Sequence, residues 1–199
     1  VGLASVHYVR QGQALGLGHA VGCARQHVGG EPFAVLLGDD VLDDHGRLLQ
    51  RMVDLCASTE RTVVAVMEFD DDHLDTHGVI AGEPDPSDPD VFHVHDMVEK
   101  PGVANAPSNL CVIGRYVLTP DIFDHIDAVP PGRDGEIQLT DALRTQAAEK
   151  PIRAIRYRGP RYDVGSKADW LRATVRLAVE RPDLGPEFRA YLREMVRSW

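Results

Sequence analysis

The chain has 199 residues, of which 43% are hydrophobic and 26% are charged, and its formal net charge at pH 7 is −10. These values are ordinary for a soluble globular protein with one substantial core, and the negative charge argues against a nucleic-acid partner. We expect no signal peptide and no membrane span, because no uninterrupted apolar stretch is long enough to cross a bilayer. Three widely spaced cysteines without a CxxC pair are expected to be reduced thiols in a cytoplasmic protein: Cys23, Cys56 and Cys111.

The first third of the chain alternates apolar segments with segments of helical spacing. Strands are expected at 4–10, 33–38 and 62–67, and helices are expected at 18–28 and 46–58. This β-α-β-α-β order predicts a parallel sheet with covering helices.

The rest of the chain has a different pattern. Two polar stretches, 70–72 and 83–90, are expected to be loops, and the second of them contains three prolines. Ser166, with Asp169 three residues later, resembles a capping box and predicts a helix start. The other expected elements are strands at 78–82, 91–98 and 110–118, a helix opening at Thr119, a helix at 138–150, a strand at 152–158 and a helix at 185–197.

An apolar run from Phe33 to Leu37 ends abruptly in Gly38, Asp39 and Asp40. Such a run is typical of a strand that is buried on both faces, as in a parallel sheet. The carboxyl ends of strands are where α/β sheets bind ligands. A carboxylate in that place is costly unless it is paired, and Mg²⁺ is a natural partner for oxygen ligands.

A second segment, Val98-Glu99-Lys100-Pro101, puts a carboxylate beside an ammonium at the end of an expected strand. A lysine is a compact point charge that suits phosphate. Together with the acidic end of the first run, this segment indicates a metal-dependent site for a phosphorylated ligand that carries a sugar. By itself, the Glu99-Lys100 pair is better explained as a solvated strand end.

Seven segments, taken in order, resemble bacterial UTP–glucose-1-phosphate uridylyltransferases over nearly the whole chain. The resemblance implies an α/β fold, namely a Rossmann-like nucleotidyltransferase mixed sheet flanked by helices, with the first β-α elements missing. It also implies that UTP and glucose 1-phosphate react with Mg²⁺ to give UDP-glucose and pyrophosphate. The segments are VRQGQALGLGHAV, FAVLLGDD, HGVIAG, MVEKP, APSNLCVIGRYVLTPDIF, DGEIQLTDAL and RYDVGSK.

The family's N-terminal glycine-rich loop, with its Arg and its following Pro-Lys segment, is not among these segments. The resemblance therefore implies that residues 1–199 are a single nucleotidyltransferase domain, the C-terminal portion of a longer enzyme, and that this portion alone is inactive. Gly38 stands where the family commonly has proline, and glycine is usual there in related thymidylyltransferases. A thymidylyl- or adenylyltransferase acting on glucose 1-phosphate, or a non-catalytic sugar-nucleotide-binding module, stays open as an alternative.

The resemblance assigns roles to particular residues. Gln11 and Gly16 would contact the pyrimidine, since an amide offers both a donor and an acceptor and a glycine lets backbone approach the ring. Asp39 and Asp163 would bind the metal and, with Lys100, would be the catalytic residues. The residues implied for the sugar phosphate are Gly78, Glu99, Lys100, Val112 and Lys167.

Several further implications are less direct. Lys167 could equally be a surface lysine. Glu136, Gln138 and Asp141 resemble residues of the sugar pocket or its wall, with a structural role favoured for Asp141. The expected partners are UTP, glucose 1-phosphate and UDP-glucose, with no nucleic acid and no membrane, and a homo-oligomer is expected because related enzymes self-associate.

Overall fold

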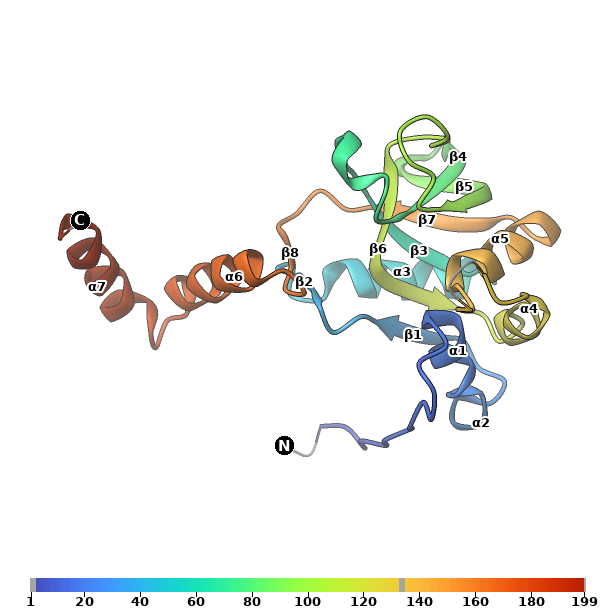
Figure 1. The fold of residues 1–199 in the computed structure, drawn as a ribbon, viewed down its shortest axis with the longest axis horizontal. Helices are drawn as coiled ribbons and strands as arrows, with labels where there is room; N and C mark the ends of the chain where they lie inside the picture. The colour runs from blue at the N-terminus through green and yellow to red at the C-terminus, as the bar shows by residue number, and fades with distance from the viewer. Residues whose placement is uncertain (1–2, 133–134, 199) are drawn as a thin grey trace. The chain divides into compact units, whose positions relative to one another are not determined.

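The computed structural model describes residues 3–132 and 135–198 (Figure 1). They form two compact units, of which the larger comprises residues 3–36 and 46–158 and the smaller comprises 37–45 and 159–198. Asp134, the first residue of the segment DGEIQLTDAL, lies outside the described residues.

The larger unit is built on a six-stranded sheet with the strand order β1-β6-β3-β7-β5-β4. The pairing of β3 with β7 is parallel, and the other pairings in this sheet are antiparallel. The expected mixed sheet is therefore confirmed, but the parallel sheet expected in the first third is wrong, because β6 lies between β1 and β3. The strands are β1 (Phe33–Leu36), β3 (Val63–Glu68), β4 (Gly78–Asp85), β5 (Asp88–Glu99), β6 (Leu110–Leu118) and β7 (Ile152–Arg156).

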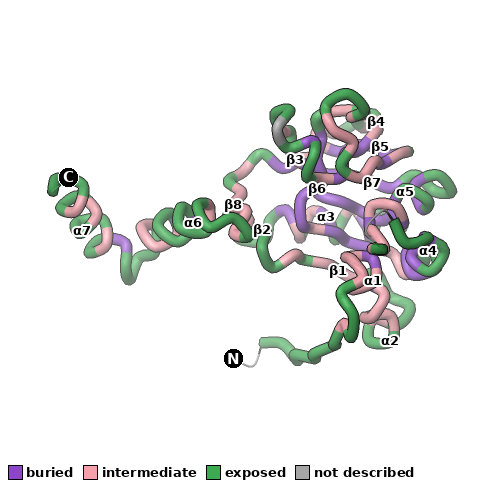
Figure 2. The backbone as a smooth tube through the Cα atoms, in the orientation of Figure 1, coloured by how far each residue is buried: buried purple, intermediate pink, exposed green. Residues whose placement is uncertain are grey.

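Helices cover the sheet, and the apolar face of each long helix explains its position. α3 buries Leu48, Met52 and Cys56 and packs against β3 and β6, while α5 packs against β5. The most deeply buried segments are the central strands β3 and β6 (Figure 2). The helices of this unit are α1 (Leu17–Gly22), α2 (Arg25–Val28), α3 (Arg47–Thr59), the 3-10 helix η1 (Asp71–His73), α4 (Ile122–Ala128) and α5 (Leu139–Glu149).

The strand β1 is not buried on both faces, contrary to the expectation from its apolar run. Its residues alternate between intermediate and exposed, and Leu36 is 50% exposed. The reason is its place at the edge of the sheet, where β6 is its one partner among the described residues. The Phe33 ring is nevertheless anchored, since it stacks on Phe123 of α4 with the ring centroids 5.2 Å apart.

Two expectations for the N-terminal region are also wrong. Residues 4–10 form no strand, and side chains such as Tyr8 are almost fully exposed, because this segment pairs with no strand among the described residues. The helix expected at 18–28 is divided into α1 and α2, because α1 ends at Gly22 and a turn at Cys23–Ala24 separates the two helices.

The polar stretch 83–90 is not a loop, because β4 and β5 continue through it as an antiparallel hairpin. Pro84 is tolerated because β4 lies at the edge of the sheet order, where a missing N–H costs least. Pro86 lies in the turn, and Pro89 lies at the start of β5, before the pairing of β5 with β7 begins at Val91. The Ser87 hydroxyl and N–H both donate to Asp85 Oδ1, at 2.6 and 2.8 Å, and close the turn. These bonds, led by the one from the Ser87 hydroxyl, hold the pKa of Asp85 well below its usual value.

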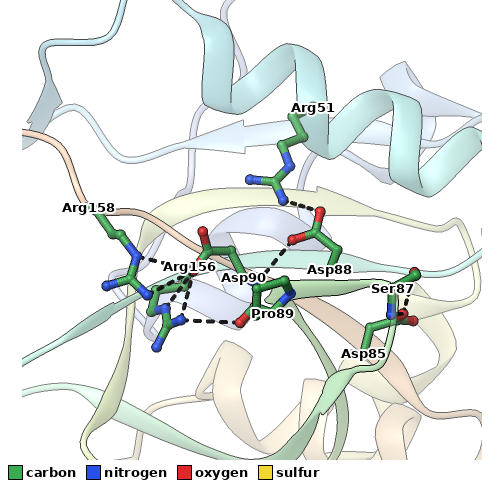
Figure 3. A network of polar contacts seen from close by, with 8 residues as sticks. All are labelled: Arg51, Asp85, Ser87, Asp88, Pro89, Asp90, Arg156 and Arg158. Atoms are coloured by element: carbon green, nitrogen blue, oxygen red, sulfur yellow. Dashed lines mark hydrogen bonds and ion pairs between the residues drawn. The ribbon is translucent and has the colours of Figure 1, made fainter.

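An ionic network ties this hairpin to the rest of the larger unit (Figure 3). Asp90 Oδ1 accepts from Arg156 Nε at 2.9 Å and from Arg158 Nε and Nη2, each at 3.1 Å. Arg51 of α3 pairs with Asp88 on the same strand end. The hairpin is therefore fastened both to the end of β7 and to α3, which compensates for its polar composition.

The smaller unit contains a two-stranded antiparallel sheet and two helices. Its elements are β2 (Asp40–Leu42), β8 (Arg161–Asp163), α6 (Lys167–Glu180) and α7 (Gly185–Arg197). The predicted cap of α6 is confirmed, since Ser166 Oγ accepts from the Asp169 N–H at 3.4 Å. Within the two described ranges, no helix has the length and apolar character that crossing a membrane requires.

Asp90→Asn should destabilise the larger unit in a pH-dependent way. The hydrogen bond from Arg156 is the main cause that lowers the pKa of Asp90. The carboxylate therefore stabilises the fold at pH values above the pKa of the unfolded chain, and this stabilisation is lost as the pH falls through the lower folded pKa. We expect a loss of about 1–3 kcal/mol near neutral pH.

The measurement is urea unfolding of wild type and variant from neutral pH to below about pH 4, where an unperturbed Asp is protonated. The difference in the free energy of unfolding should shrink as the pH falls. Glu31→Gln, which removes an exposed acid from the same unit, is the control and should have little effect. A difference that stays constant with pH would contradict the role given to Asp90.

Candidate active site

In the smaller unit, backbone pairing brings Asp39 and Asp163 together although they are far apart in the sequence. The register of β2 and β8 sets Asp40 opposite Asp163, and the Val164 N–H donates to Asp39 O at 2.7 Å. A methyl group placed on Gly165 would lie 3.1 Å from Asp163 Oδ1 and 3.6 Å from Asp39 Oδ2. The two carboxylates therefore converge on the same glycine.

This pair of carboxylates fits Mg²⁺ better than it fits zinc. Mg²⁺ is commonly held by one or two carboxylates together with water and substrate phosphates. Zinc sites need three or four protein ligands, and no group of three or more His, Cys, Asp or Glu side chains suited to a metal occurs among the residues described. Asp163 Oδ1 also accepts from the Gly165 N–H at 3.1 Å, which fixes the direction of its carboxylate.

Asp40, next to the proposed ligand Asp39, has a structural partner. Its side chain is buried, and Arg161 Nε donates to both of its carboxylate oxygens, at 2.9 and 3.0 Å. The sequence reasoning did not single out Arg161, because its partner lies far away in the chain. The ion pair closes β2 against β8 directly beside the two converging carboxylates.

In the larger unit, Glu99, Gly78 and Thr140 lie together. The register of β4 and β5 sets Gly78 opposite Glu99. A methyl group on Gly78 would lie 2.9 Å from Thr140 Oγ1 and 3.2 Å from Glu99 Oε2. Glycine at position 78 therefore lets the side chains of Thr140 and Glu99 approach the backbone closely. Thr140, in the first turn of α5, is a candidate site residue that was not predicted from the sequence, although it lies within the segment DGEIQLTDAL.

Lys100 and Val112 border the same place. Lys100 has a left-handed backbone, with φ of 46°, and its N–H donates to His77 O at 3.1 Å. Its Nζ lies 3.6 Å from Glu99 Oε1, and the side chain is half exposed. Val112 follows Cys111, which pairs with Val79 where β6 meets β4. Three neighbouring strand segments thus carry these predicted sugar-phosphate residues.

Backbone hydrogen bonds join the loop before α1, and the start of α1, to Ile137. Ile137 N–H donates to Leu15 O at 2.8 Å, and Ile137 O accepts from the Gly18 N–H at 2.9 Å. Gly16 has a φ of 92°, and a methyl group on it would lie 2.8 Å from Ile137 O. Only glycine therefore fits at position 16 without moving the backbone.

Gln11 and Gly16 are in direct contact, as Gln11 Nε2 donates to Gly16 O at 3.0 Å. Within the described part of the chain, Gln11 Oε1 accepts from no group and the Gly16 N–H donates to none. The loop therefore offers one acceptor and one donor to a ligand.

The remaining predicted residues have different surroundings. Lys167 is exposed and begins α6, where it borders an open hollow of about 320 Å³, and its role toward phosphate stays a prediction. Gln138 Nε2 donates to Glu136 Oε2 at 2.9 Å, so these two side chains are paired with each other. Asp141 lies in the first turn of α5 and is half-buried.

Residues 3–180 match the family model described as nucleotidyl transferase. The chain belongs to this family. Its resemblance to bacterial UTP–glucose-1-phosphate uridylyltransferases is confirmed by relatives bearing that name. The relative from Staphylococcus epidermidis is 38% identical over 97% of this chain and 66% of its own length. YngB of Bacillus subtilis is 40% identical over 98% of this chain and 65% of its own length.

Solved structures agree with these sequence relatives. A UDP-glucose pyrophosphorylase from Acinetobacter baumannii is 38% identical, with a TM-score of 0.86 over 98% of this chain and 67% of its own. Another UDP-glucose pyrophosphorylase, solved with UDP-glucose, is 44% identical, with a TM-score of 0.82 over 88% of this chain and 66% of its own. The chain thus spans about two thirds of the length of the relatives that it matches.

Arg161→Leu should destabilise the smaller unit strongly. The substitution leaves the buried carboxylate of Asp40 without its cation, and we expect a loss of about 3–5 kcal/mol in the free energy of unfolding. Arg172→Leu is the matched control, because Arg172 is 74% exposed in its ion pair and should cost less than about 1 kcal/mol. Urea unfolding checks both variants, and equal small losses would show that the Asp40 pair is dispensable.

Proposed function

We propose that the natural gene product that contains this chain transfers a uridylyl group from UTP to glucose 1-phosphate and releases pyrophosphate. The proposal rests on the convergence of the Asp39 and Asp163 carboxylates beside Gly165. It is supported by relatives, 38–40% identical, that are named for this activity. A structural relative was solved with UTP bound, and another with UDP-glucose.

The chemistry asks the protein to position and neutralise its substrates. A phosphate oxygen of glucose 1-phosphate attacks the α-phosphorus of UTP directly, and pyrophosphate leaves, so no enzyme nucleophile is needed. The attack brings several negative charges together, and Lys100 would offset the charge of the sugar phosphate. Most of the acceleration would come from alignment and from fixed charges rather than from proton transfer.

Asp39 and Asp163 are the residues that would hold Mg²⁺. When bound, the ion would neutralise phosphate oxygens and orient the attacking and leaving groups. The Gly165 N–H would keep the Asp163 carboxylate in place through the hydrogen bond to Oδ1.

Gln11 and Gly16 would bind the nucleobase by complementarity. The imide edge of uracil presents an N–H flanked by carbonyl oxygens. Gln11 Oε1 would accept from that N–H, and the Gly16 N–H would donate to a neighbouring carbonyl. The acceptor and donor that this loop leaves without partners among the described residues match that edge.

Glu99 would bind the sugar. Its carboxylate and the Thr140 hydroxyl both lie close to Gly78, where the carboxylate can accept hydrogen bonds from glucose hydroxyls. Gly78 and Val112 would contribute backbone groups, and Lys167 would contribute a further positive charge for phosphate.

A thymidylyltransferase is the second candidate, because thymine presents the same imide edge as uracil. The solved structure of a glucose-1-phosphate thymidylyltransferase from Bacillus anthracis is 22% identical, with a TM-score of 0.62, and supports the fold alone. The relatives at higher identity favour UTP. Comparison of turnover with UTP, dTTP and ATP separates the candidates. We further propose that the protein acts in the cytoplasm as a homo-oligomer.

Asp39→Asn should preserve the fold and lower turnover about 10²–10³-fold, since it deletes one fixed group that stabilises transition-state charge. The amide has nearly the same shape as the carboxylate but lacks the charge that would hold Mg²⁺. The measurement is pyrophosphate release by the natural gene product from UTP and glucose 1-phosphate across a Mg²⁺ titration.

Asp43→Asn is the matched control, because it removes the same charge from the same segment at a residue without a proposed role. It should retain turnover. Near wild-type activity of Asp39→Asn at every Mg²⁺ concentration would remove Asp39 from the site. A wild-type protein that releases no pyrophosphate from UTP and glucose 1-phosphate would contradict the proposed function itself.

Glu99→Gln and Lys100→Ala should affect the reaction differently. Loss of the Lys100 ammonium should reduce the rate about 10²–10³-fold with every sugar phosphate, by analogy with other charge-stabilising groups. Glu99→Gln should mainly weaken the preference for glucose 1-phosphate over galactose 1-phosphate, because the carboxylate contacts hydroxyls. Initial rates with both sugars test this, and an unchanged preference in Glu99→Gln would count against its role.

A further inference from the structure

The orientation of the Gln11 side-chain amide is determined by its surroundings. Gly16 O is a backbone carbonyl and can only accept a hydrogen bond. The Gln11 atom that lies 3.0 Å from it must therefore be the amide nitrogen Nε2. The reversed amide would set two oxygens against each other.

The same nitrogen also determines the tautomer of His19. Gln11 Nε2 lies 3.0 Å from His19 Nδ1, and a primary amide nitrogen has two hydrogens and no acceptor lone pair. His19 Nδ1 must accept the second hydrogen, so this contact requires the ring hydrogen to lie on Nε2. Both donors of Gln11 are thereby used within the protein.

The position of His19 is itself fixed by the fold. His19 lies in the short helix α1, and the preceding residue, Gly18, is buried against Ile137 with its N–H bonded to Ile137 O. A methyl group on Gly18 would lie 2.8 Å from that oxygen. The backbone that carries the imidazole is therefore held against the backbone of Ile137.

We propose that His19 is a positioning residue that selects the nucleobase by orienting Gln11. With both N–H groups held by Gly16 O and His19 Nδ1, the amide can present only its oxygen to the base. An oxygen acceptor matches the imide N–H of uracil or thymine and repels the N3 lone pair of cytosine. The inference rests on the proposed function, since it concerns the base of the same nucleotide substrate.

Without His19, one N–H of Gln11 loses its partner. Gly16 O then opposes the reversed amide alone, so the orientation that offers a donor to cytosine costs less than it does in the wild-type protein. His19→Ala should therefore reduce the preference for UTP over CTP about tenfold, the effect expected of one hydrogen bond, while kcat with saturating UTP changes little. His19→Asn should retain the preference, because Asn Oδ1 can accept from nearly the same place as His Nδ1.

The experiment measures the dissociation constants of UTP and CTP by calorimetry, and kcat with UTP, for the natural gene product and its variants. The set is wild type, His19→Ala, His19→Asn, Gln11→Ala and the double variant Gln11→Ala/His19→Ala. If His19 acts through Gln11, then His19→Ala should change the UTP/CTP ratio in the wild-type background and leave it unchanged in the Gln11→Ala background. Circular dichroism confirms that each variant is folded.

A second measurement needs no substrate. The ¹⁵N chemical shifts of the His19 ring in the ligand-free protein should show hydrogen on Nε2. Hydrogen on Nδ1, or a UTP/CTP ratio that His19→Ala leaves unchanged, would overturn the inference and leave the proposed function standing. A wild-type protein that does not bind UTP would overturn the proposed function and this inference with it.

Discussion

Strand β6 is the element on which the larger unit depends, because it pairs with three other strands. It is hydrogen-bonded to β1 on one side and to β3 on the other, and it meets β4 where Cys111 faces Val79. All of its residues are buried except Arg115, which is partly exposed. β6 runs antiparallel to all three strands, and its pairing with β4 brings Val112 to the start of β4, where Gly78 and Glu99 lie.

The acidic residues of the two units differ in whether an arginine binds their carboxylates. Asp39 and Asp40 are adjacent, yet Asp40 is buried against Arg161 whereas Asp39 is exposed and turned toward Asp163. Asp90 resembles Asp40, since arginines hold it on the hairpin that they brace. Carboxylates with cationic partners maintain the fold, whereas the converging pair is the one that we propose to bind Mg²⁺.

Local patterns in the sequence predicted local structure well. The helices at 46–58 and 185–197 and the cap at Ser166 are present within a residue or two, because spacing and capping depend on neighbours along the chain. The run at 33–38 was placed correctly, but its burial was not. An apolar strand has the same composition at an edge as at a centre, and its pairing with β6 is set by residues far along the chain. For the same reason, the contact of Thr140 with Gly78 and the Asp40–Arg161 pair had no local signal. Glu99 and Lys100 could be singled out as candidates because they follow each other at a strand end.

The backbone of Lys100 has a consequence for how this protein can be stabilised. A φ of 46° is favourable for glycine, but in a lysine it costs about 1–2 kcal/mol. Glycine at this position would therefore relieve strain, and a stability screen would select it. It would also delete the ammonium beside Glu99. With the role that we propose for Lys100, the strained lysine marks a place where selection for thermal resistance and selection for activity would oppose each other.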